Sequence, residues 1–197
     1  MCTALIYVPG LHGQTLPATG DVHYDSGFPS VNFGNSSYLS VSGNSKAYIQ
    51  FDLSSLPPGT NAAGITKVNL VLWVGRISSA GNLQISEAGA AWNESTLTFG
   101  NTPATGALVG LVATPLVPDF ITVDVTSSVV KWLGNPALNF GFAIEGSPGS
   151  TTVYLDSKES VTTSHQAMLS FQQAGPVARP ARRSCSSTPI SAPAGPT

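Results

Sequence analysis

The residues best suited to chemistry lie in one short segment near the start of the chain. Asp21, His23 and Asp25 alternate with Val and Tyr, so on a strand their three side chains would share one face. A carboxylate beside an imidazole is the arrangement that orients a general base. No nucleophile motif such as Gly-x-Ser-x-Gly accompanies His23 or the other two histidines, His12 and His165. We therefore expect no catalytic site, and a protein that is not an enzyme.

Carboxylates are also ligands for a hard cation. Ca²⁺ prefers roughly six to eight oxygen ligands, and we expect Asp21, Asp25, Asp156 and Glu159 to supply them. The alternative is structural, with Asp25 capping the turn that follows it and Glu159 pairing with the preceding lysine in solvent. A glycosidase acid/base pair would use the same residue types, but nothing in the sequence indicates a cleft or a raised pKa. A structural Ca²⁺ is the only cofactor that we consider.

Aromatic residues gather in the same early part of the chain. Sugar-binding sites combine aromatic rings, which stack on the sugar, with amides that hydrogen-bond the hydroxyls. The alternative is that these rings close one end of a hydrophobic core, as we expect of Trp92 and Trp132. The candidate ligand surface consists of Tyr24, Phe28, Asn32, Phe33, Asn35 and Tyr38.

Composition argues against two kinds of partner. Only 9% of the 197 residues are charged, against about 25% in an average soluble domain. Ten acidic residues outnumber eight basic ones, so we expect no basic face and no binding of nucleic acid. No apolar run approaches the roughly 18 residues of a membrane span, and residues 1–13 do not resemble a signal peptide. Sparse charge instead suits large surfaces that are buried in an assembly.

Hydrophobic alternation between turn signals predicts an all-β fold, a two-sheet β-sandwich of jelly-roll type with about nine to eleven short strands. The clearest hairpin joins residues 36–42 to 46–53 through a Gly-Asn turn. A long strand over 65–75 directs Trp73 away from the core. One short helix is expected over 126–133, with Thr126 as its N-cap.

The two ends of the chain differ from the middle. We expect an N-terminal arm or strand over residues 1–19, the sandwich domain over 20–173, and an extended Pro-rich tail over 174–197. Cys2 and Cys185 lie near opposite ends. They are too few for a disulfide framework, and we leave open whether they join the termini, join neighbouring chains or are unrelated thiols.

A series of short motifs follows in order over residues 20–172. They are Asp21–Gly27, Asn32–Ser36, Lys46–Ser54, Trp92–Ser95, Asn101–Pro103, Val123–Thr126, Lys131–Trp132, Asn139–Phe142 and Asp156–Ser160. The series resembles the motifs of DNRLRE-domain proteins, which are similar to a family of carbohydrate-binding modules. This resemblance implies a jelly-roll sandwich, usually an extracellular or surface module without catalysis, with a polysaccharide ligand in some members.

Two functions follow from these observations. The first is a non-enzymatic structural module that assembles with copies of itself or decorates a larger particle, such as a virion or a surface filament, through its terminal arms. The alternative is a secreted carbohydrate-binding or adhesive module. Either function places the protein outside the cell, on its surface or in a virion.

Overall fold

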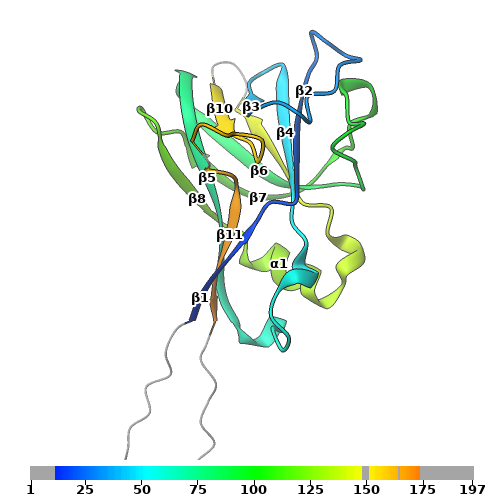
Figure 1. The fold of residues 1–197 in the computed structure, drawn as a ribbon, viewed down its shortest axis with the longest axis vertical. Coiled ribbons are helices and arrows are strands. Elements are labelled where there is room, and N and C mark those ends of the chain that lie inside the picture. The colour runs from blue at the N-terminus through cyan, green and yellow to red at the C-terminus, as the bar shows by residue number, and fades with distance from the viewer. Residues whose placement is uncertain (1–11, 148–150, 164, 174–197) are drawn as a thin grey trace, which may run out of the picture.

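Two antiparallel sheets packed face to face form the domain (Figure 1). The structure, a computed structural model, describes residues 12–147, 151–163 and 165–173. Sheet A has the strand order β1-β11-β5-β10-β3, with β8 also paired to β5, and sheet B has the order β2-β4-β9-β6-β7. The strands are β1 (His12–Pro17), β2 (Gly20–Asp25), β3 (Tyr38–Val41), β4 (Ser45–Gln50), β5 (Ile65–Ser79), β6 (Asn82–Ala88), β7 (Thr105–Ala113), β8 (Asp119–Asp124), β9 (Phe142–Gly146), β10 (Thr152–Asp156) and β11 (Met168–Gln173).

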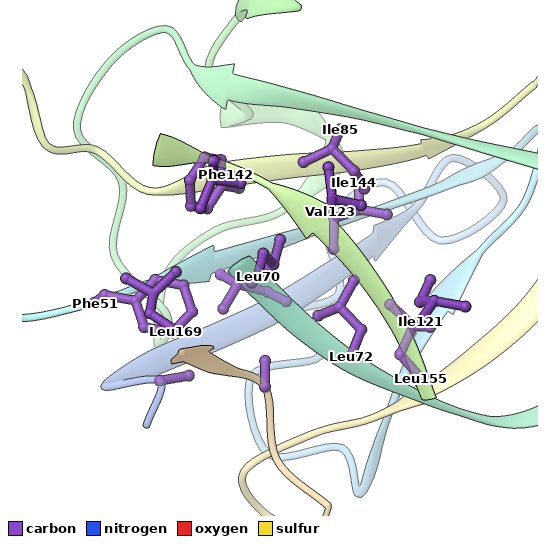
Figure 2. Packing of buried hydrophobic residues seen from close by; sticks show 14 of the residues in the cluster. Phe51, Leu70, Leu72, Ile85, Ile121, Val123, Phe142, Ile144, Leu155 and Leu169 are labelled. Atoms are coloured by element: carbon purple, nitrogen blue, oxygen red, sulfur yellow. The ribbon is translucent and has the colours of Figure 1, made fainter. Parts of the chain in front are cut away.

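The space between the sheets is filled by apolar side chains at alternating strand positions, as the sequence pattern predicts. Leu70 and Leu72 of β5 point from sheet A toward Phe142 and Ile144 of β9 in sheet B (Figure 2). All four are at most 1% exposed. Burying each such side chain contributes about 1.5–3 kcal/mol, so the sandwich is stabilised by this layer. The all-β sandwich prediction is confirmed.

One predicted pairing is wrong. The segments on either side of the Gly-Asn turn do not form a hairpin, because β3 pairs with β10 in sheet A while β4 pairs with β2 and β9 in sheet B. Backbone hydrogen bonds between Ser42 and Ser45 close the turn, and the chain crosses there from one sheet to the other. The hydrophobic alternation is the same for a hairpin and for this crossover, because Leu39 of sheet A and Ala47 of sheet B both face the core.

The helix α1 (Thr126–Gly134) covers one end of the sandwich and buries Trp132 against Phe142, with ring centroids 4.9 Å apart. The predicted N-cap is wrong by one residue, since Val125 is the cap and Thr126 is the first helical residue. The Thr126 hydroxyl instead accepts a hydrogen bond from Val68 N (2.9 Å), which joins the helix to sheet A. The short 3₁₀ turns are Leu53–Ser55, Ala62–Gly64, Phe99–Asn101 and Pro136–Leu138.

Part of the expected N-terminal arm is a strand of the sandwich. Residues 12–17 form β1, which pairs along its full length with β11 at the edge of sheet A. Residues 1–11 and the tail 174–197, and with them Cys2 and Cys185, lie outside the described residues. Within the described part of the chain, no helix has the length and apolar character that crossing a membrane requires.

Candidate functional site

A pocket of about 460 Å³ opens on the outer face of sheet A, the face turned away from sheet B. Its base is formed by β5 and β10, which pair with each other, and β3 adds one side. The turns before β8 and after β10 complete the rim. The lining residues are Tyr38, Trp73, Gly75, Arg76, Pro118, Tyr154, Leu155, Asp156, Thr162 and Thr163.

A register shift in β5 places two of the lining side chains on this face. Val74 pairs with Leu155 and Arg76 pairs with Tyr154, so Gly75 is an extra residue opposite the β10 strand. Such a bulge resets the alternation of side chains. Trp73 before the bulge and Arg76 after it therefore both face outward, although they are three residues apart.

Aromatic rings form the walls of the pocket. Tyr38 and Tyr154 meet edge to face with centroids 5.3 Å apart, and the Arg76 guanidinium lies 3.6 Å from the Tyr154 ring centroid. Trp73 is held by the rings of Phe120 and His165, at centroid distances of 4.7 and 4.4 Å. These contacts fix the rings before any ligand binds, which lowers the entropic cost of binding.

Polar groups converge on the same pocket. The Asp156 carboxylate accepts a hydrogen bond from the Thr163 hydroxyl, and the His165 Nδ1 atom lies 3.6 Å from its Oδ2. A Cβ atom on Gly75 would come within 3.0 Å of Asp156 Oδ1, so glycine keeps this side of the pocket open. Rigid aromatic walls with a carboxylate, a guanidinium and hydroxyls suit a ligand that has both an apolar face and many hydroxyl groups.

Three of the four aromatic residues that we expected to form one surface lie in one row of rings. Phe28 meets Phe33 edge to face with centroids 6.4 Å apart, and His23 stacks between Phe33 (4.6 Å) and Tyr38 (5.7 Å). Tyr38, at one end of the row, also lines the pocket, and Phe28 is 59% exposed. Tyr24 lies outside the row and packs against Phe99 at 5.3 Å.

The two asparagines of the expected surface have different environments. Asn32 Nδ2 donates hydrogen bonds to the carbonyl oxygens of Glu94 (2.7 Å) and Leu97 (2.8 Å). It thereby ties the loop after β2 to the loop after β6, which lie side by side at the upper right of Figure 1. Asn35 is exposed in the same loop. Sequence reasoning placed Trp73 on the outer face but did not recognise Trp73, Arg76 or Tyr154 as site residues.

Of the four carboxylates predicted to bind a metal, two come together. Asp21 and Glu159 lie beside Glu94, with one carboxylate oxygen from each of the three within 4.8 Å of the others. Asp25 instead caps its turn, since its Oδ1 accepts a hydrogen bond from Gly27 N (2.8 Å), and Asp156 lines the pocket on sheet A. Glu94 lies in the Trp-Asn-Glu-Ser motif, but its spacing from Asp21 in the sequence does not indicate that the two carboxylates meet.

Burial dominates the electrostatics of this carboxylate cluster. Asp21 is 1% exposed, and burial raises its pKa from 3.8 to about 7, helped by the negative charges of Glu159 and Glu94 and opposed by a hydrogen bond from Lys158 N. The Lys158 ammonium pairs with Glu94 Oε1 at 3.0 Å and with Glu159 Oε1. The one ammonium group thus pairs with two of the three carboxylates.

His23 has a structural role that predicts a pH effect. Its ring is 3% exposed and stacks on Phe33. Burial lowers its pKa from 6.5 to about 4, against the opposing charge of Asp25. Between these two pH values the unfolded chain binds a proton that the folded chain does not, so the contribution of His23 to stability is complete above pH 6.5 and is lost as the pH falls toward 4.

His23→Phe is expected to remove this acid sensitivity. Denaturant unfolding of both proteins at pH 7 and pH 4.5 measures it: the wild type should lose about 2–3 kcal/mol relative to the variant on acidification. The comparison between proteins cancels the titration of every other group that the substitution leaves unchanged. An equal loss in the two proteins would contradict the assignment.

The fold is that of a β-sandwich module. The model of carbohydrate-binding module family 96 matches residues 13–171, and the chain therefore belongs to this family. The match begins within β1, which agrees with the inclusion of that strand in the domain. No curated protein matches the chain significantly. The resemblance to carbohydrate-binding modules is confirmed.

Proposed function

We propose that the protein binds a polysaccharide, without catalysis, in the pocket on the outer face of sheet A. The single observation that supports this most is the convergence of Trp73, Tyr154 and Tyr38 with Arg76 and Asp156 around one open pocket. Membership of a carbohydrate-binding family supports the same ligand class. Such modules act outside the cell, where polysaccharides are found, and we propose the same location here.

The pocket suits a sugar chain rather than a small buried ligand. It is a depression on the face of a sheet that is open to solvent, so a polymer has access to it. Aromatic rings supply apolar contact for the faces of sugar rings, while the carboxylate and guanidinium supply hydrogen bonds to hydroxyls. The family match favours this alternative over the self-assembling structural module.

Retention on polysaccharide gels tests the proposal. The purified protein is run through native gels that contain neutral, acidic or basic polysaccharides, with an unrelated protein of similar size as the mobility reference. We expect retardation in at least one gel and relief by the soluble oligosaccharide of that polymer. Unchanged mobility in all gels would overturn the proposal, and light scattering in the same buffer measures any self-association.

A further inference from the structure

We propose that Asp21, Glu94 and Glu159 bind a Ca²⁺ ion between elements of the two sheets. Asp21 lies in β2 of sheet B, Glu159 follows β10 of sheet A, and Glu94 lies in the loop after β6. The proposal does not depend on the carbohydrate pocket.

The spacing of the three carboxylates fits one ion. Their oxygens lie within 4.8 Å of one another. Calcium–oxygen distances are about 2.3–2.6 Å, so two oxygens on opposite sides of the ion are about 5 Å apart. All three carboxylates can therefore contact the same ion without a change in the fold.

Two buried oxygen atoms in this cluster have no partner among the described residues. They are Asp21 Oδ1 and Glu159 Oε2, each with almost no accessible surface. The other oxygen of each carboxylate is used, because Asp21 Oδ2 accepts from Lys158 N (2.8 Å) and Glu159 Oε1 pairs with Lys158 Nζ. A buried carboxylate oxygen without a partner is costly. A metal ion would satisfy both atoms at once.

The charges of the cluster also call for a divalent cation. Three carboxylates carry −3 when ionised, and the Lys158 ammonium that contacts two of them carries +1, which leaves −2. A proton shared between Asp21 and Glu159 would neutralise only half of this charge. Hard, carboxylate-rich sites with several protein ligands suit Ca²⁺ better than Mg²⁺, which keeps most of its water.

Calcium binding is tested on protein that has been treated with a chelator and then freed of it. Titration calorimetry with CaCl₂ should show one site, and CaCl₂ at about a hundred times the dissociation constant should raise the melting temperature by about 5–10 °C. MgCl₂ should have a smaller effect. No heat and no thermal shift in millimolar CaCl₂ would overturn the proposal.

Three variants separate metal binding from a purely structural role. Glu159→Gln and Asp21→Asn should both lose the calcium-dependent shift, and Asp21→Asn should melt no lower than the metal-free wild type, because it removes a buried charge. Glu87→Gln is the control, since its carboxylate pairs with Lys131 elsewhere, and its calcium response should be unchanged. A calcium response retained in both Asp21→Asn and Glu159→Gln would contradict the site.

Discussion

Replacing Trp73 by alanine is expected to abolish retention on any polysaccharide that the wild type binds. The indole is part of the pocket wall and lies on the outer face of β5, between Leu72 and Val74, which point into the core. Loss of the apolar contact of one aromatic ring costs about 1.5–3 kcal/mol of binding free energy, which corresponds to a roughly 10- to 150-fold weaker affinity. Affinity electrophoresis and titration calorimetry measure this change.

A matched control distinguishes the pocket from the aromatic residues at the end of the sandwich. Phe28→Ala removes an exposed ring outside the pocket and should leave retention unchanged. Both variants should keep the wild-type melting temperature within a few degrees, because neither ring belongs to the core. If Phe28→Ala abolishes binding and Trp73→Ala does not, the ligand surface is the loop after β2 and our assignment is wrong.

Gly141→Ala is expected to lower the free energy of unfolding by roughly 2–5 kcal/mol, because a conformational cost and a steric cost add. Gly141 has a φ of +77°, a conformation that favours glycine, and a Cβ atom there would lie 2.1 Å from Ile49 O. Ile49 pairs with Phe142, the residue that follows Gly141. The methyl group would therefore force β4 and β9 apart in the middle of sheet B. Denaturant unfolding measures the loss.

Alanine substitutions at two other glycines measure the conformational cost without the steric clash. Gly59 has a φ of +92° but open space around its Cβ position, so Gly59→Ala carries the conformational cost alone, about 1–2 kcal/mol. Gly134 ends α1 with nothing within 4 Å and no positive φ, so Gly134→Ala should change stability by less than about 1 kcal/mol. Equal losses in Gly141→Ala and Gly59→Ala would show that the predicted clash is relieved.

The positions of strands could be read from the sequence, but their partners could not. Alternation in 36–53 reflects burial of one face, and burial is the same whether two strands pair side by side or face each other across the core. The predicted pairing of residues 36–42 with residues 46–53 is wrong for this reason. The resemblance to carbohydrate-binding modules supplied the fold type but not the pairing of strands.

The candidate site was harder to predict because it depends on a bulge and on long-range pairing. A strict period of two places Arg76 on the opposite face from Trp73, and only the extra residue at Gly75 brings them together. Tyr154 joins them from a strand almost eighty residues later. Glu94 reaches Asp21 across a similar separation. The spacing of these residues in the sequence does not indicate that Tyr154 lies beside Arg76 or that Glu94 lies beside Asp21.

The pairing of β1 with β11 has a mechanical consequence. His12 is opposite Gln173, so the first and last described residues lie next to each other at one end of sheet A (Figure 1). Tension applied between these two residues would load the outermost pair of the ladder first and open the remaining pairs one after another. Each hydrogen bond contributes only about 0.5–1.5 kcal/mol. The edge of the domain should therefore peel apart at low force, while the core behind β5 remains folded.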